Sequence, residues 1–155
     1  MVGNYKGLSF LFPMEQLFER YVAKQLARKL PAGFRLRSQV ANLSLVTHRD
    51  EKWFKLKPDI VVYDQARVVT VMDTKWKLLD QNQDNTKQKY NLSQADMYQL
   101  FAYGEKYLQG KGELYLIYPR HHMLSVPLPC FEYHASLKLH VVPYDLVTDI
   151  CSINL

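Results

Sequence analysis

The stretch VMDTKWK, residues 71–77, places Asp73 and Lys75 two positions apart inside an otherwise apolar run. Side chains alternate along a strand, so these two charged groups point to the same face. Charged groups are costly to bury without partners. Both faces of the strand begin apolar, which predicts that the pair lies where a central strand leaves the core. In open α/β sheets, ligands bind beyond such strand ends.

A second carboxylate, Asp59, lies one strand earlier in KPDIVVY. If the two strands pair through the DQAR turn, Asp59 and Asp73 come close on one face. Two such carboxylates repel each other unless a cation or a shared proton lies between them. Oxygen ligands suit Mg²⁺, and a metal beside a lysine stabilises charge during phosphate-ester hydrolysis. The structural alternative is a surface ion pair and an ordinary turn at Pro58.

The elements that must position these residues follow from hydrophobic periodicity and turn signals. Residues 80–94 are polar and predict a loop. Ser93, near the end of this loop, and Asp96 resemble a capping box for the helix that follows. Helices are expected at residues 13–30 and about 94–108, and strands at 35–46, 53–64, 68–79, 113–119, 123–129 and 137–146. This order indicates a mixed α/β fold with extra C-terminal strands, in a single domain over residues 1–155.

The composition is that of a globular protein, with 155 residues, 48% hydrophobic and 23% charged. The formal net charge of +5 permits a polyanionic partner but does not require one. No apolar run approaches the ~18 residues that cross a bilayer, and the N-terminus lacks the features of a secretory signal. We therefore expect a cytoplasmic protein without membrane contact.

The residues PD at 58–59 and DTK at 73–75 resemble the PD-(D/E)XK nuclease superfamily, whose core is a mixed sheet flanked by helices in the order αβββαβ. More narrowly, five segments are similar to McrC, the nuclease subunit of the McrBC modification-dependent restriction system. They are MEQLFERYV, LKPDIVV, VMDTKWK, ADMYQLFAYGEKY and LIYP, and the likeness runs from about Pro13 to Pro119.

This resemblance implies that Asp59 and Asp73 bind a divalent metal, Mg²⁺ with Mn²⁺ as a substitute. The backbone carbonyl of Thr74 would be a further metal ligand. Lys75 would orient or activate the attacking water and stabilise the phosphate. Related nucleases add a glutamate from the first helix. Glu15 and Glu19 both fall within the core-facing arc of that helix, and either can instead reach solvent at its edge. Glu19 fits the family pattern better.

The resemblance also implies a role for Gln99 and Tyr103, which lie four apart on one helical face. In RecB-like and related nucleases a Q-x-x-x-Y helix lies beside the active site and contacts DNA or supports the catalytic lysine. The structural alternative is a plain amphipathic helix in which Tyr103 belongs to the core.

The function implied is that of a Mg²⁺-dependent endonuclease acting on double-stranded DNA, with an AAA+ GTPase of the McrB kind as its partner. McrC proteins carry an N-terminal region that engages McrB rings, and we expect that region to be absent from this chain. Two alternatives remain: a RecB-like repair or recombination nuclease, and a non-catalytic DNA-binding or assembly module that keeps the fold.

Overall fold

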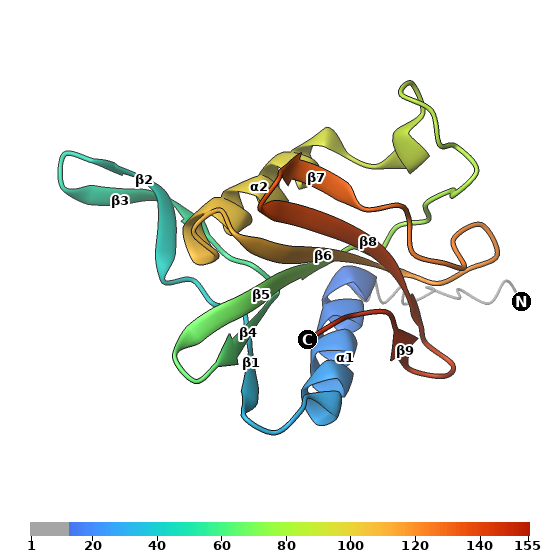
Figure 1. The fold of residues 1–155 in the computed structure, drawn as a ribbon, viewed down its shortest axis with the longest axis horizontal. Helices are drawn as coiled ribbons and strands as arrows, with labels where there is room; N and C mark the ends of the chain where they lie inside the picture. The colour runs from blue at the N-terminus through green and yellow to red at the C-terminus, as the bar shows by residue number, and fades with distance from the viewer. Residues whose placement is uncertain (1–12) are drawn as a thin grey trace, which may run out of the picture.

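The computed structural model describes residues 13–155, which form a mixed sheet with one long helix on each face (Figure 1). The elements are α1 (Met14–Lys29), β1 (Phe34–Ser38), β2 (Leu43–His48), β3 (Glu51–Leu56), β4 (Ile60–Asp64), β5 (Arg67–Thr74), η1 (Lys89–Asn91), α2 (Gln94–Tyr107), β6 (Gly112–Pro119), β7 (Phe131–His134), β8 (Leu137–Asp145) and β9 (Ile150–Cys151). The mixed α/β class expected from the sequence is confirmed. Neither helix is long and apolar enough to cross a membrane.

The main sheet has seven strands in the order β1-β4-β5-β6-β8-β7, with β9 also paired to β8. The pairs β1–β4 and β4–β5 are antiparallel, whereas the pairs β5–β6 and β6–β8 are parallel. Parallel neighbours need a crossover connection, and α2 lies in the one between β5 and β6. The start of β4 and the end of β5 therefore meet at the same end of the sheet.

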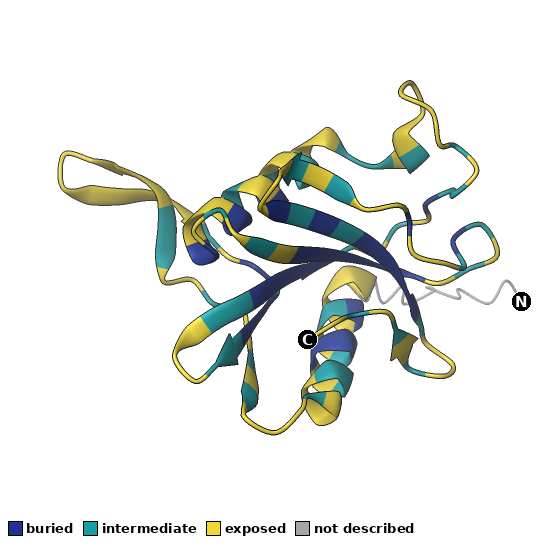
Figure 2. Cartoon of the chain, in the orientation of Figure 1, coloured by how far each residue is buried: buried dark blue, intermediate teal, exposed yellow. Residues whose placement is uncertain are grey.

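Apolar side chains fill both faces of the central strands. The cluster beneath α2 contains Val61, Val71, Leu100, Leu114 and Leu116, and the cluster beneath α1 contains Phe18, Val22, Ile60, Met72 and Ile117. Figure 2 shows this burial concentrated in β5, β6 and β8. Near-continuous apolar runs are typical of strands covered on both faces. The expectation that a central strand leaves the core at Asp73 is confirmed, but the strand expected at residues 68–79 ends at Thr74.

The strands expected at residues 35–46 and 53–64 are each broken in two. Gln39, with a φ of 55°, follows the end of β1, and Pro58, which has no N–H to donate, separates β3 from β4. Strands β2 and β3 form a separate two-stranded hairpin, which projects away from the main sheet (Figure 1). The backbone amide of Gln39 donates to the carbonyl of Asp59 at 3.1 Å. The hairpin thus leaves and rejoins the sheet at adjacent points.

The C-terminal third differs from expectation at one strand. Residues 123–129 contain no strand, and the chain forms β7 only after Pro127 and Pro129. The strand expected at 137–146 is confirmed as β8. One edge of β8 pairs with β7 and, further along, with β9, and Pro143 lies between these two paired regions. The missing N–H of Pro143 therefore removes no ladder hydrogen bond on that edge.

Candidate active site at the end of the central strands

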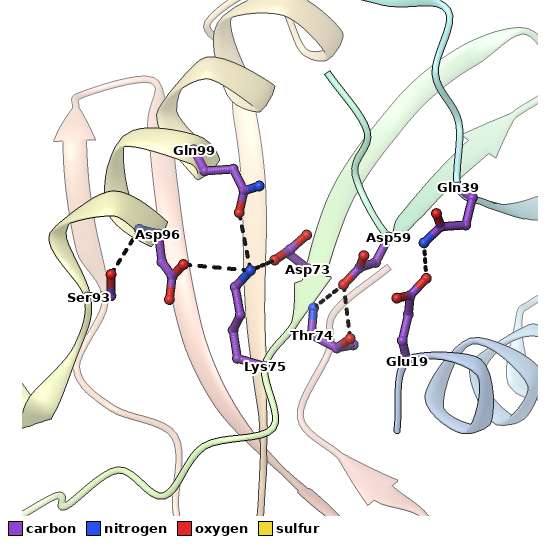
Figure 3. A network of polar contacts seen from close by, with 9 residues as sticks. All are labelled: Glu19, Gln39, Asp59, Asp73, Thr74, Lys75, Ser93, Asp96 and Gln99. Atoms are coloured by element: carbon purple, nitrogen blue, oxygen red, sulfur yellow. Dashed lines mark hydrogen bonds and ion pairs between the residues drawn. The ribbon is translucent and has the colours of Figure 1, made fainter. Parts of the chain in front are cut away.

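Asp59 ties the start of β4 to the end of β5. Its Oδ2 accepts hydrogen bonds from the backbone amide of Thr74 at 2.8 Å and from the Thr74 hydroxyl at 2.9 Å. The antiparallel register places Ile60 opposite Met72. Asp59, just before β4, therefore lies opposite the last residues of β5. These bonds fix the Asp59 carboxylate beside Asp73 (Figure 3).

Asp73 is an almost wholly buried carboxylate with an incompletely satisfied oxygen. It is 2% exposed, and its Oδ2 accepts no hydrogen bond of ordinary geometry from the described residues. The same oxygen lies 2.7 Å from Lys75 Nζ, so the contact is an ion pair rather than a well-aligned hydrogen bond. Burial and the charge of Asp59 raise the pKa of Asp73 to about 7, although Lys75 opposes them. Such an oxygen can accept a cation.

Lys75 is held by three polar groups at the same end of the sheet. Besides Asp73, its Nζ lies 3.6 Å from a carboxylate oxygen of Asp96 and donates to Gln99 Oε1 at 3.3 Å. Burial alone would lower the pKa of Lys75, but the carboxylates of Asp73 and Asp96 outweigh it, and the net pKa is raised. Lys75 is therefore a fixed ammonium that stabilises negative charge, not a free base.

Helix α2 presents Asp96, Gln99 and Tyr103 toward this network. The hydroxyl of Ser93 caps the helix by accepting from the Asp96 amide at 3.5 Å, which confirms the expected helix start. Asp96 and Gln99 are three apart, so both reach Lys75 from one helical face (Figure 3). The sequence indicated the capping role of Asp96 but not its contact with Lys75.

Two tyrosines lie behind the acidic groups on the same face of the sheet. Tyr103 is 2% exposed, and its pKa is raised by burial and then by the charges of Asp73 and Asp59. Tyr103 thus belongs to the core and also borders the acids. Tyr118 on β6 was not identified from the sequence. Burial and the charges of Asp96 and Asp73 raise its pKa, and its hydroxyl has no hydrogen-bond partner among residues 13–155.

Of the two candidate glutamates on α1, the structure places Glu19 beside Asp59. The Gln39 side chain donates to Glu19, and burial followed by the charge of Asp59 raises the pKa of Glu19. Glu15, one turn earlier, is exposed. A pocket of about 390 Å³ opens next to Glu19 and is lined by Gln16, Glu19, Arg20, Ala23, Ser38, Gln39 and Lys57.

The donor set fits a hydrated hard cation better than a closed protein cage. Within residues 13–155 no group of three or more His, Cys, Asp or Glu side chains is gathered as a metal-binding cluster. Mg²⁺ keeps several waters and takes one or two carboxylates, so Asp59 and Asp73 suffice for it. Lys75 is the one cation that contacts the buried Asp73 carboxylate within residues 13–155, and burial with the charge of Asp59 leaves that carboxylate able to bind a further cation.

Comparison with known proteins identifies the family. A sequence model of the family described as "McrBC 5-methylcytosine restriction system component" matches residues 1–119. The chain belongs to the McrBC family. The matched region contains both aspartates, Lys75 and all of α2, and the McrC-like assignment made from the sequence is confirmed.

A solved structure shares the fold of this McrBC-family chain. It is the refined half-complex from a tetradecameric assembly of Thermococcus gammatolerans McrB AAA+ hexamers with bound McrC, and the TM-score is 0.62 at 20% sequence identity. The alignment covers 92% of this chain but only 30% of the matched chain, so the present chain corresponds to less than a third of that protein. No curated protein matches the sequence.

Proposed function

We propose that this chain is the metal-dependent DNA endonuclease domain of an McrC-like restriction subunit. The observation that carries the proposal is the buried Asp73 carboxylate, whose Oδ2 lies 2.7 Å from the Lys75 ammonium and which is beside a second carboxylate, Asp59. The elements α1, β1, β4, β5, α2 and β6 follow the αβββαβ order of the PD-(D/E)XK core, with the β2–β3 hairpin inserted. That order supports assignment to this superfamily.

In this proposal Asp59, Asp73 and the carbonyl of Thr74 hold Mg²⁺, or Mn²⁺ in its place, and Glu19 supports the site from α1. The bound metal supplies Lewis acidity and neutralises charge on the phosphate. Lys75 orients the attacking water and stabilises the negative charge that develops on the phosphate. Asp96 and Gln99 hold the ammonium in place at 3.6 and 3.3 Å. Tyr103 closes the apolar side of the site.

The proposed substrate is double-stranded DNA, and the proposed partner is an AAA+ GTPase of the McrB kind. Family membership supports the partner, as does the fold shared with an assembly that contains McrB hexamers and McrC. We place the reaction in the cytoplasm, where restriction systems meet incoming DNA. Cleavage by this chain is expected to depend on the partner for its choice of sites.

The test is cleavage of a covalently closed plasmid by the 155-residue chain, with and without an McrB-like partner, in Mg²⁺, Mn²⁺ or Ca²⁺. Nicking or linearisation that needs Mg²⁺ or Mn²⁺ and is lost in Asp73→Asn and Lys75→Met supports the proposal. A matched control is Asp84→Asn, which changes an exposed loop carboxylate. Degradation of linear DNA alone would favour a RecB-like enzyme. Binding without any cleavage, with the partner present, would favour a non-catalytic module.

A further inference from the structure

The β2–β3 hairpin, residues 43–56, exposes a set of apolar side chains that the fold does not cover. Leu45, Val46, Trp53 and Phe54 are exposed by 41%, 44%, 45% and 68%. In Figure 2 the outer part of the hairpin is exposed along its length, whereas its base is partly buried. Large apolar side chains gathered in this way on a surface mark an interaction site.

The hairpin is anchored at its base and free at its tip. Leu43 and Leu56 pack against the α2 cluster, and the Tyr107 hydroxyl on α2 donates to the carbonyl of Leu56 at 3.4 Å. At the tip, Arg49 and Asp50 have φ values of 48° and 64°, the left-handed conformation of a tight two-residue turn. Phe54 also has a positive φ of 56°, which interrupts the ladder and is an energetically costly way to aim a side chain.

Basic residues are interleaved with these apolar ones. Arg49, Lys52, Lys55 and Lys57 lie on the hairpin or directly after it, against two acidic residues, Asp50 and Glu51. Trp53 is paired with Val46, and Lys55 with Ser44. His48 packs against Trp53 with ring centroids 5.0 Å apart. The surface combines positive charge, which attracts phosphates, with apolar side chains, which can contact thymine methyl groups in the major groove of a duplex.

The position of the hairpin next to the candidate active site indicates which partner binds its exposed surface. Lys57 and Pro58 are the only residues between β3 and Asp59. The site itself carries carboxylates from Glu19, Asp59, Asp73 and Asp96, which repel a phosphate backbone, so neighbouring basic groups must supply the attraction. Six-residue strands extend about 20 Å, which exceeds the ~8.5 Å depth of the DNA major groove, and that groove is wide enough to admit a two-stranded ribbon.

We propose that the β2–β3 hairpin is an arm that enters the major groove of duplex DNA next to the scissile phosphate, which a metal at Asp59 and Asp73 would bind. A second copy of the chain fits less well, because a symmetric contact would bring the basic residues of two arms together. The inference rests on the proposed function for the placement of the scissile phosphate. The contact between arm and duplex can be measured without cleavage.

The experiment uses the full 155-residue chain with a fluorescently labelled duplex in Ca²⁺, so that binding is recorded without turnover. Lys52→Gln/Lys55→Gln is compared with Lys24→Gln/Arg28→Gln, which removes two exposed charges from α1. The arm variant should bind at least about tenfold more weakly at low salt and lower the salt slope by about 2, and the control should change neither much. Phe54→Ser should weaken binding about fivefold without a change in net charge, because an apolar contact with the groove is lost.

A second readout comes from the arm itself. The chain has two tryptophans, so Trp76→Phe leaves Trp53 as the only indole. Addition of duplex DNA should quench Trp53 emission in that variant, because the ring moves from water to the groove. Lys52→Gln/Lys55→Gln on the same background should shift the quenching curve to higher DNA concentration by the factor seen in binding.

The outcomes separate this inference from the proposed nuclease function. If the arm variants bind DNA more weakly but the wild-type chain does not cleave DNA in Mg²⁺, the DNA-binding role of the hairpin is supported and the nuclease function is rejected. Cleavage with equal binding by the arm variant and the α1 control would overturn the arm, as would the absence of any duplex binding. A change in the molar mass of the chain in the arm variants, with DNA binding intact, would assign the hairpin to a protein contact instead.

Discussion

Thr74 binds Asp59 twice, through its backbone amide at 2.8 Å and its hydroxyl at 2.9 Å, so that the last residue of β5 fixes the carboxylate that precedes β4. Loss of the hydroxyl removes one hydrogen bond to a charged group but leaves the shape of the side chain. Thr74→Val should lower the free energy of unfolding by about 1–2 kcal/mol and weaken Mn²⁺ binding, measured by urea unfolding and calorimetry. Thr74→Ser is the control and should retain both properties. Equal Mn²⁺ affinity in the two variants would show that this bond does not position the metal ligand.

The buried Asp73 predicts a pH dependence of stability in the metal-free protein. Its pKa is raised by burial from 3.8 to about 7 in the folded state, so the folded chain holds a proton that the unfolded chain has released between about pH 4 and pH 7. The free energy of unfolding should therefore fall as pH rises through this window, by an amount on the order of 3 kcal/mol. Urea unfolding at pH 5 and pH 8 measures it.

Asp73→Asn provides the control for that titration, because it keeps the shape and removes the ionisable group. The slope between pH 5 and pH 8 should flatten in this variant. Mg²⁺ should restore stability at pH 8 in the wild-type chain and not in Asp73→Asn, since a cation replaces the proton. A wild-type slope that persists in the variant would assign the titration to another group.

Asp96 is expected to act through Lys75. Asp96→Asn removes one of the carboxylates that raise the pKa of Lys75, so cleavage should fall by up to about fivefold, which corresponds to the ~1 kcal/mol of one partly exposed ion pair. The helix start should survive, because Ser93 accepts from the backbone amide of residue 96. Circular dichroism and plasmid cleavage measured from pH 6 to pH 9.5 test this. A cleavage profile identical to that of wild type would limit Asp96 to helix capping.

The two buried tyrosines should respond oppositely to removal of their hydroxyls. The Tyr118 hydroxyl has no partner among residues 13–155, so Tyr118→Phe should leave the free energy of unfolding unchanged or raise it by up to about 1 kcal/mol. The Tyr103 hydroxyl is influenced by the backbone of Lys57 and by the charges of Asp73 and Asp59, so Tyr103→Phe should lower the free energy of unfolding by about 1 kcal/mol. Tyr103→Phe should also weaken duplex binding or turnover. Thermal and urea unfolding, with duplex titration, compare the pair.

The geometry around Asp73 could be predicted from the sequence because it depends on local rules. Strand alternation places Asp73 and Lys75 on one face, and the hairpin of β4 and β5 brings Asp59 opposite them. Helical spacing likewise placed Gln99 on the face of Tyr103. Each of these relationships spans a strand, a turn or a helix, and the side-chain period alone determines it.

The features that the sequence did not predict depend on longer connections or on single backbone angles. Gln39 interrupts an alternating run with a positive φ, which no residue type there demanded. Asp96 was identified as a capping residue, but its contact with Lys75 arises from the crossover that docks α2 on the sheet. Tyr118 was one more apolar position in a buried strand until the fold brought it beside Asp96 and Asp73.

The hydrogen bond from Gln39 to the carbonyl of Asp59 closes the chain at the root of the β2–β3 hairpin. Residues 40–58 therefore form an insertion whose two ends already meet, and a tight turn could replace it without parting β1 from β4. Such an insertion can lengthen, shorten or exchange in evolution while the residues of the candidate active site stay in place. The same junction gives an engineer a position at which to graft a different hairpin or loop onto an unchanged sheet.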